Sequence, residues 1–422
     1  MAENSNFIQT IHVEILQKNN SCLKENEVIT LASNWLASQG ETIPTTATSI
    51  TKFEDALISQ HIASITFNHD ICKSMNGESK EARYYVYSFN STAPEYEEAE
   101  EEQQVSTQWI LPTQDFHGLW ESLIYDTHVK AELLNYVSTA LHFSEKGVNP
   151  NIVSWNKMIL LHGPPGTGKT SLCKALAQKV CIRFSSKFAY GQLVEVNTHS
   201  LFSKWFSESG KLVSKMFHSI LKLVEDPTVL VIVLLDEVET LARSRASALG
   251  GNEPSDALRV VNALLTHLDM IKRYPNVLIF TTSNITDAID VALIDRADMK
   301  QFIGLPSVDA IYQVYVTCIT ELQESKIICT RDLILPLYRM QNVHISEPSI
   351  LNEQSCEERT MKLKEIAQKS EGLSGRSLRK MPLIACSLLT RRELVTLDTY
   401  LDALSKAVEK HWNDVKHLKV PA

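Results

Sequence analysis

The fold of this chain is decided at Gly163-Pro164-Pro165-Gly166-Thr167-Gly168-Lys169-Thr170. The stretch fits the pattern G-x-x-x-x-G-K-[ST], in which backbone N–H groups of a glycine-rich loop curl around phosphate oxygens. In this pattern Lys169 reaches the β- and γ-phosphates of a nucleoside triphosphate, and the Thr170 hydroxyl ligates Mg²⁺ at the start of a helix. A strand-like run at 158–162 and a helical run at 171–177 flank the loop. The sequence therefore predicts a site for a nucleoside triphosphate and Mg²⁺ rather than a plain Gly/Pro turn.

Two adjacent carboxylates follow a second apolar run. Residues 229–235 are apolar and largely β-branched, as in a strand buried on both faces, and Asp236 and Glu237 come directly after them. Doubly wound sheets bind ligands at the carboxyl ends of their strands. We therefore expect Asp236 to hold Mg²⁺ and Glu237 to polarise the attacking water, the competing interpretation being a buried strand with an acidic turn. A third run at 277–283 leads to Asn284, whose amide can orient the same water.

Composition and residue patterns divide the chain into predicted domains. Its 422 residues are 44% hydrophobic and 22% charged, as in a soluble globular protein of two or three domains. Alternating runs within residues 1–94 predict a small α+β domain, which either recognises substrate or serves as a stability cap. Six Glu lie between positions 95 and 102, so we expect an acidic, solvated linker over 95–106. A large α/β domain that carries the glycine-rich loop is predicted over 107–306, and a small, mostly helical domain over 307–422.

Charge and hydropathy exclude two classes of function. The formal net charge of −9 argues against a protein that grips a nucleic-acid backbone, which requires concentrated Lys and Arg. The run 229–235 is far shorter than the roughly 20 apolar residues that span a bilayer. Eight Cys occur without a C-x-x-C pair, and residues 1–16 carry no signal peptide, so a reducing compartment is expected. We expect no direct contact with nucleic acid or membrane.

These motifs together resemble the AAA+ ATPase superfamily, with Walker A at 163–170, Walker B at 231–237 and a sensor 1 strand that ends at Asn284. The resemblance implies two further catalytic arginines. Arg296 looks like the arginine finger, which a neighbouring subunit supplies and which contributes about 10³ to 10⁵ in rate. Arg376 looks like the sensor 2 residue, on a helix that Ser374 would cap.

Arg296 departs from the double arginine of many AAA+ proteins, and the alternative for it is a surface ion pair with Asp295 or Asp298. The chain holds one P-loop and no second copy. A ring must therefore consist of several identical chains.

The AAA+ resemblance also gives a role to residues 201–211, where Trp205 and Phe206 stand among polar, turn-forming residues. In AAA+ unfoldases the matching loop faces a central channel and grips an extended polypeptide. Rigid aromatic rings suit this task, because they offer a large contact area and lose little rotamer entropy. The alternative is that one ring packs beneath the loop, and which of the two faces the channel stays open. A second channel loop is expected at 246–255.

A narrower resemblance is to the pachytene checkpoint ATPase family. It rests on WILP at 109–112, FHGLWESLIYD at 116–126, SKWFSESGK at 203–211, DEVETL at 236–241 and DRAD at 295–298. The resemblance implies a homohexamer that hydrolyses ATP to convert HORMA-domain proteins from a closed to an open or partly unfolded state. It also implies that Gly118 and Leu119 lie near the adenine.

The same resemblance names the expected partners and setting. The partners are Mad2-type checkpoint proteins, presented by a comet-type adaptor, and meiotic chromosome-axis HORMA proteins. The setting is spindle assembly checkpoint control and meiotic prophase, in the nucleus and cytoplasm and on chromosomes or kinetochores during division. Two other classes stay open: an ATP-gated scaffold or clamp ring that binds partners without translocating them, and a nucleic-acid loader, which the acidic charge disfavours.

Overall fold

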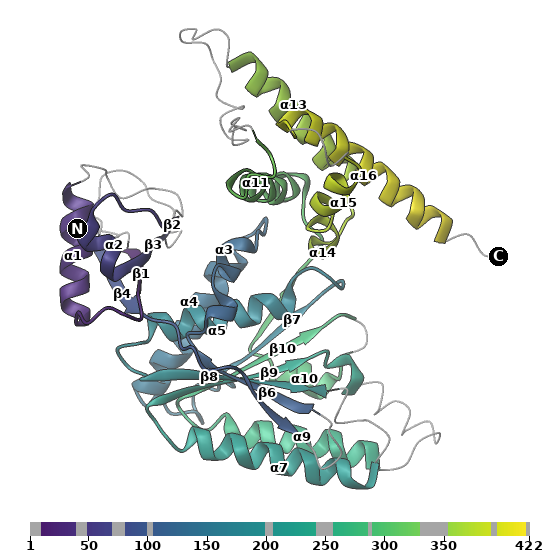
Figure 1. The fold of residues 1–422 in the computed structure, drawn as a ribbon. Coiled ribbons are helices and arrows are strands. Elements are labelled where there is room, and N and C mark those ends of the chain that lie inside the picture. The colour runs from purple at the N-terminus through teal and green to yellow at the C-terminus, as the bar shows by residue number, and fades with distance from the viewer. Residues whose placement is uncertain are drawn as a thin grey trace, which may run out of the picture. The chain divides into compact units, whose positions relative to one another are not determined.

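The fold is described from a computed structural model of the chain (Figure 1). The described residues are 10–38, 49–69, 81–98, 104–198, 206–241, 256–285, 289–329, 353–389 and 395–418. The chain forms two compact units. Unit 1 contains Met1–Trp120, Val129–Leu161 and Thr170–Gln301, and unit 2 contains Glu121–His128, His162–Lys169 and Phe302–Ala422. This division differs from the predicted domain limits, because the N-terminal domain groups with the ATPase sheet and the phosphate loop groups with the lid.

The N-terminal domain is a four-stranded sheet with two helices on one face, as predicted. The strands are β1 (Thr10–Gln17), β2 (Ser49–Ile50), β3 (Ile62–His69) and β4 (Glu81–Tyr87), in the order β2-β3-β1-β4. The helices are α1 (Glu25–Ser38) and α2 (Ala56–His61). Alternate side chains of β1 supply the core, because successive residues of a strand point to opposite faces. Ile11, Val13 and Ile15 are fully buried with apolar residues of both helices.

The ATPase sheet has seven strands in the order β11-β7-β10-β9-β8-β6-β5. Their bounds are β5 Glu95–Glu98, β6 Gln104–Leu111, β7 Met158–His162, β8 Tyr190–Asn197, β9 Val229–Asp236, β10 Val277–Ser283 and β11 Met299–Phe302. Strand β9 runs parallel to β8 and β10, and β6 runs antiparallel to β8. The predicted strands before Lys169, Asp236 and Asn284 are therefore β7, β9 and β10, which are neighbours in this sheet.

The predicted acidic linker over 95–106 is partly wrong. Glu95–Glu98 form strand β5, which pairs antiparallel with β6 at the edge of the sheet. Charged residues are common on edge strands, because they deter pairing with a further strand without preventing the pairing on the inner side. Backbone pairing therefore prevails here over the charge pattern from which the linker was predicted.

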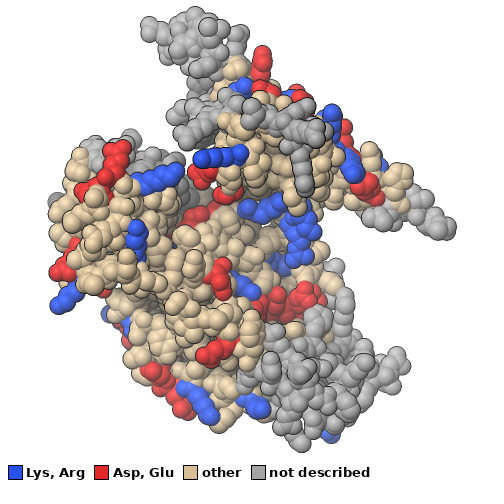
Figure 2. Space-filling view, in the orientation of Figure 1, with Lys and Arg blue, Asp and Glu red and all other residues tan. Residues whose placement is uncertain are grey.

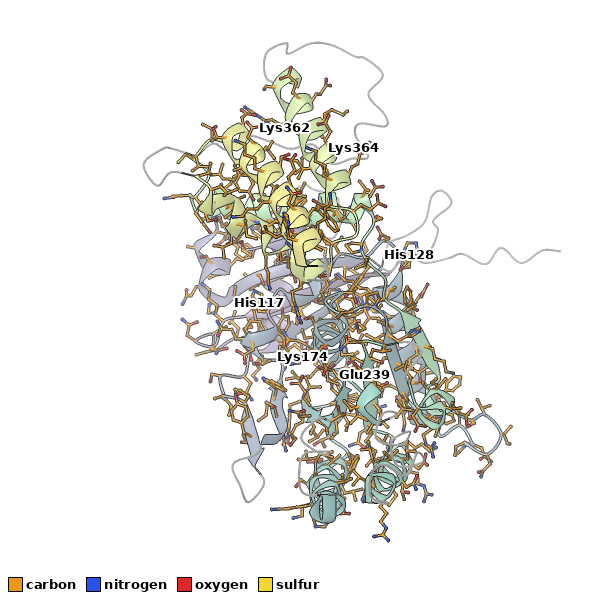
Figure 3. The ribbon with its side chains drawn as sticks, turned by 90° about the vertical axis from the view of Figure 1, so that its right-hand side faces the viewer. His117, His128, Lys174, Glu239, Lys362 and Lys364 are labelled. Carbon is orange, nitrogen blue, oxygen red and sulfur yellow. The ribbon has the colours of Figure 1, made fainter. Side chains whose placement is uncertain are left out.

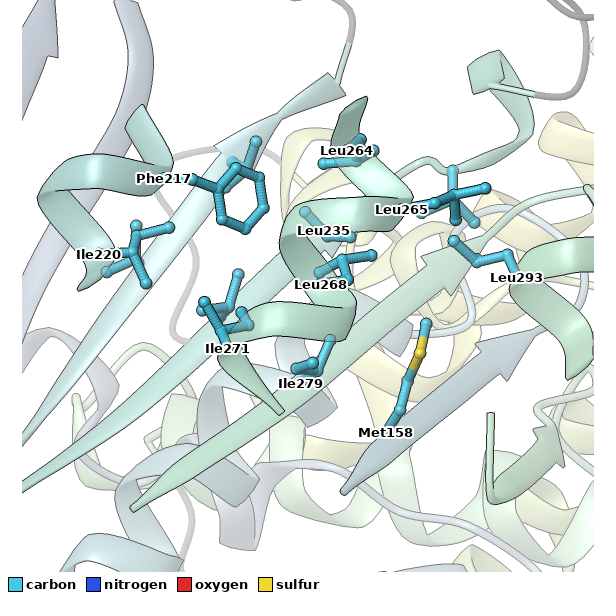
Figure 4. Close-up of a cluster of buried hydrophobic side chains, with 14 of the residues drawn as sticks. Met158, Phe217, Ile220, Leu235, Leu264, Leu265, Leu268, Ile271, Ile279 and Leu293 are labelled. Carbon is cyan, nitrogen blue, oxygen red and sulfur yellow. The ribbon is translucent and has the colours of Figure 1, made fainter. Parts of the chain in front are cut away.

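Helices alternate with the strands of the ATPase sheet along the chain. They are α3 (Leu119–Ser122), α4 (Val129–Glu145), α5 (Lys169–Arg183), α7 (Phe206–Val224), α9 (Asp256–Ile271) and α10 (Val291–Arg296). Helices α7 and α9 lie side by side and share one core cluster with β9 and β10 (Figures 1 and 4). Its members include Phe217 and Ile220 of α7, Leu264 and Leu268 of α9, and Leu235 of β9.

The lid is helical, as predicted. It contains α11 (Val308–Glu324), α13 (Glu353–Lys369), α14 (Gly375–Leu378), α15 (Met381–Ser387) and α16 (Leu397–Leu418). A core that includes Tyr315, Leu363 and Tyr400 joins these helices. Lys362 and Lys364 extend from α13 (Figure 3), and Lys362 pairs with Asp402 of α16 at 2.7 Å. Across the described residues, none of the helices combines the length and the hydropathy needed to cross a membrane.

Candidate active site

The phosphate loop has a backbone that its glycines permit. Gly163, Gly166 and Gly168 have φ values of 140°, 77° and 91°, which side chains rarely allow. A Cβ on Gly166 would also lie 2.8 Å from the Ser374 hydroxyl. The Lys169 side chain is folded back on the loop, where its Nζ donates to the carbonyls of Gly163 at 2.9 Å and Pro164 at 2.7 Å. This ammonium thus already lies over the loop that would hold the phosphates.

The predicted sensor 2 segment lies against the same loop. Ser374 caps α14, since its side chain accepts a hydrogen bond from the Ser377 N–H, as predicted. The backbone N–H of Arg376 donates to the Gly166 carbonyl at 3.0 Å. This hydrogen bond holds the lid segment against the phosphate loop. The role of the Arg376 side chain stays a prediction.

Asp236 ends β9 beside two hydroxyl groups. The Thr170 hydroxyl donates to Asp236 Oδ1 at 2.8 Å, and the Thr282 hydroxyl of β10 donates to the same oxygen. Magnesium prefers hard oxygen ligands and is usually held by one or two carboxylates together with phosphate. The adjacent Thr170 and Asp236 oxygens therefore fit the predicted metal site.

Glu237 has a left-handed backbone with φ of 56°, which is uncommon for a residue with a side chain and is concentrated at functional sites. Its carboxylate Oε1 accepts a hydrogen bond from the Asn284 amide at 3.1 Å. Hydroxyl groups of Thr198 and Thr240 donate to its carbonyl at 3.2 and 3.0 Å. The structure thus joins the predicted water-polarising carboxylate to the predicted sensor 1 residue.

The prediction missed the residues that hold this pair. The carboxylate of Glu239, labelled in Figure 3, is 6% exposed and accepts from the Asn284 N–H at 3.2 and 3.3 Å. Thr282 donates to Asp236 and accepts from the Glu237 N–H at 3.2 Å. The polar run at 281–283, at the end of an otherwise apolar strand, was the sequence signal for Thr282. Glu239 stood within the quoted 236–241 motif without an assigned role.

A cleft of about 340 Å³ opens beside the acid pair. Its lining comes from the ends of β6, β8 and β9 and comprises Ser106, Thr107, Glu195, Val196, Asn197, Asp236 and Glu237. Asp236 and Glu237 therefore line an open space, which water must reach for a carboxylate to polarise it.

Arg296 ends the short helix α10, and its guanidinium pairs with Asp269 of α9 rather than with Asp295 or Asp298. Its Nη2 lies 2.8 Å from Asp269 Oδ2, and its Nη1 donates to the Ala292 carbonyl at 2.8 Å. Burial raises the pKa of Asp269, but hydrogen bonds from Arg296 and Lys272 outweigh this and hold that pKa below its ordinary value. The candidate arginine finger is therefore tethered within its own chain.

Other predicted site residues have less support. Trp205 and the expected loop at 246–255 lie outside the described residues. Helix α7 begins at Phe206, so the second half of 201–211 is helical rather than a loop. Gly118 has φ of 67° and Leu119 begins α3, which leaves their proposed contact with adenine a prediction.

Comparisons with known proteins agree with this arrangement. The family model "ATPase family associated with various cellular activities" matches residues 159–305, and the model "TRIP13-like, AAA+ ATPase lid C-terminal domain" matches residues 307–412. The pachytene checkpoint protein 2 homologs of Gallus gallus and Homo sapiens are 46% and 45% identical to this chain. Each alignment covers 97% of this chain, and it covers 94% of the chicken and 95% of the human protein.

Solved structures are also similar. "Structure of C. elegans PCH-2" matches with a TM-score of 0.78 and 34% identity, over 96% of this chain and 100% of that one. "Structure of E. coli MS115-1 HORMA:CdnC:Trip13 complex" matches with a TM-score of 0.51 and 16% identity, over 71% and 94%, which shows the fold alone. From the P-loop, the acid pair and nearly full-length identity to these relatives, the chain belongs to the pachytene checkpoint protein 2 family and is an AAA+ ATPase.

Proposed function

We propose that this chain is the subunit of a homohexamer that uses ATP hydrolysis to convert HORMA-domain proteins from a closed to an open or partly unfolded state. The observation that carries the hydrolytic part is the Glu237 carboxylate, held at 3.1 Å by Asn284 beside the Asp236–Thr170 pair. The HORMA part rests on the family to which the chain belongs. A solved E. coli structure of similar fold is named as a complex with a HORMA protein.

Each residue of the site has a task in this proposal. Lys169 contacts the β- and γ-phosphates, while Thr170 and Asp236 hold Mg²⁺. Glu237 accepts a proton from the attacking water, and Asn284 keeps that carboxylate in position. Arg376 responds to loss of the γ-phosphate and passes this response to the lid.

The ring supplies the remaining parts. Arg296 acts on the site of the neighbouring subunit, after it releases Asp269. Trp205 and Phe206 grip the substrate in the central channel, and the N-terminal domain receives Mad2-type or meiotic axis HORMA proteins, the former through a comet-type adaptor. The corresponding places of action are the nucleus, the cytoplasm and, during division, chromosomes and kinetochores.

Hydrolysis is needed because a closed HORMA protein is kinetically trapped. A ring that only binds can shift an equilibrium by no more than its differential affinity for the two states. The competing function is therefore an ATP-gated clamp, which would hold partners without translocating them.

The test is the ratio of closed to open Mad2-type protein, resolved by ion exchange after incubation with this chain, a comet-type adaptor and ATP. We expect conversion by the unaltered chain and none by Glu237→Gln. We also expect Trp205→Ala to lose conversion while it keeps ATP turnover. A closed form that persists despite rapid ATP turnover would favour the clamp.

A further inference from the structure

The N-terminal sheet buries both of its faces. One face of β1 packs on α1 and α2, as described above. On the opposite face, His12 and Glu14 are also buried, and Glu14 is only 2% exposed. Buried carboxylates are rare unless a cation is close to them, so the neighbours of Glu14 identify what covers this face.

The cover is α5, the helix that follows the phosphate loop. Lys179 Nζ lies 2.6 Å from Glu14 Oε2, and Arg183 Nε lies 3.7 Å from Glu14 Oε1. The Lys179 and Arg183 side chains are 5% and 9% exposed. Ions buried this deeply are costly to separate, because the partner left behind keeps its charge without water. The pair therefore fixes the N-terminal domain on α5 in one register.

Neighbouring positions of α5 hold the segment that connects the two domains. The Gln178 side-chain carbonyl accepts from the Thr113 N–H at 2.9 Å. Lys179 Nζ also lies 5.7 Å from the centre of the Trp120 ring. The C-terminal half of α5 thus contacts both the N-terminal domain and the chain that leads from it.

The other end of α5 belongs to the ATPase site. Thr170, in its first turn, donates to Asp236. An α-helix rises 1.5 Å per residue, so the 15 residues of α5 span about 22 Å as one rigid rod. A displacement at Thr170 is therefore transmitted to Lys179 and Arg183.

We propose that Glu14 is a positioning residue of the ATPase, through which the N-terminal domain and the nucleotide site are coupled along α5. Couplings between two equilibria are reciprocal, so a nucleotide that shifts α5 alters the docking of the N-terminal domain on α5, and this docking alters the affinity for nucleotide by the same factor. This coupling does not depend on the proposed HORMA substrate.

The test measures both directions of the coupling in the full chain. In the unaltered protein, ATPγS should change hydrogen exchange of β1 and β3 amides as well as that of α5. In Glu14→Gln, α5 should still respond while β1 and β3 no longer do. The Kd for ATPγS should rise about five-fold, while kcat for ATP stays nearly unchanged.

Three further variants make the test specific. Lys179→Met should act in the same direction as Glu14→Gln, and the exchanged pair Glu14→Lys with Lys179→Glu should restore the response of β1. Glu25→Gln removes the same charge from the exposed first turn of α1 and should change nothing. The proposal is overturned if β1 of Glu14→Gln still responds to ATPγS, or if only the melting temperature falls while the Kd for ATPγS is unchanged.

Discussion

Two parts of the same compact unit are held in different ways: the acid pair, Asp236 and Glu237, and the arginine tether, in which Arg296 pairs with Asp269. Asp236 and Glu237 are held by neutral hydroxyl groups, of which those of Thr198 and Thr282 come from almost fully buried residues. Arg296 is held by Asp269, and these two side chains are 28% and 34% exposed. The first arrangement depends on hydrogen bonds from hydroxyl groups at or near the strand ends, and the second on a charge pair that is partly exposed to water.

This difference indicates that Asp236 and Glu237 are fixed in position, whereas the Arg296 side chain can move. Hydrogen bonds that buried hydroxyl groups donate to a carboxylate are little screened by salt, and they keep the catalytic groups preorganised. Partly exposed ion pairs contribute little to stability and are screened by salt. We therefore expect the acid pair to stay in place during turnover. We expect the Arg296 guanidinium to leave Asp269 and to contact the nucleotide phosphate of a neighbouring subunit in the proposed ring.

The largest expected effect is that of Arg296→Ala, which should lower kcat by about 10³ to 10⁵ if the guanidinium acts in the transition state. The decisive measurement mixes this variant with Glu237→Gln chains. In a mixed ring, a site with intact Glu237 on one chain can face intact Arg296 on the next.

Activity in this mixture, absent from either variant alone, is the expected result. If the mixture stays as inactive as its components, Arg296 does not act across a subunit boundary. The Asp269 pair is then its whole function.

Removal of the Glu237 charge by Glu237→Gln should reduce kcat by about 10² to 10⁴, the usual contribution of a general base. Gln keeps the side-chain oxygen that accepts from Asn284, so the local structure should survive. Binding of a fluorescent ATP analogue at unaltered affinity is the control. Turnover close to the original value would contradict the assignment.

The sequence was informative about the acid pair for a physical reason. Asp236 and Asn284 stand at or directly after the carboxyl end of a strand, and Thr170 follows a third strand across the phosphate loop. Such ends meet at one edge of a parallel sheet. The contact between Thr170 and Asp236 could therefore be expected from 66 residues away. The same logic predicted that Asn284 lies near Glu237.

The sequence was less informative about the arginine segment. Arg296 pairs with a residue 27 positions earlier on another helix, and no spacing rule connects the two. The nearer carboxylates, Asp295 and Asp298, were the alternatives that sequence distance offered. Likewise Glu14 gave no signal in a strand of ordinary alternation, since only the packing on α5 distinguishes its face from a solvated one.

Thr282→Val tests the hydrogen bonds that hold Asp236 and Glu237. Valine has a similar shape, but the hydroxyl that serves Asp236 and the Glu237 N–H is lost. A hydrogen bond to a charged group contributes about 1.5 to 3 kcal/mol, so kcat should fall roughly ten-fold or more. Thr281→Val is the matched control, because the Thr281 hydroxyl donates to the Ile159 carbonyl and serves neither carboxylate. Equal losses in both variants would indicate strand damage instead.

Lys157→Met tests whether a buried charge close to Asp298 behaves differently from the partly exposed Arg296–Asp269 pair. Lys157 is 3% exposed, and burial lowers its pKa to about 8 although Asp298 opposes this. The unfolded chain, with a pKa of about 10.4, binds more protons between these two values, so stability should rise with pH by up to about 1.4 kcal/mol per pH unit. Urea unfolding at pH 8 and pH 10 should show this rise relative to Lys157→Met. If the free energy of unfolding changes equally with pH in both proteins, the Lys157 ammonium is hydrated in the folded chain.

The smallest effect is expected from Asp269→Asn. The pair is partly exposed, so its loss should reduce the free energy of unfolding by less than about 1 kcal/mol, and by less still in 0.5 M NaCl. The lowered pKa of Asp269 gives the sign with pH: the stabilisation is complete above the ordinary pKa of a carboxyl group and is lost as the pH falls through the lowered value. Hydrogen exchange of α10 amides should therefore rise with salt in the unaltered chain but not in Asp269→Asn, while β10 amides stay unchanged in both. A salt response shared by α10 and β10 would remove the distinction between a movable arginine and a fixed acid pair, since both would then open together.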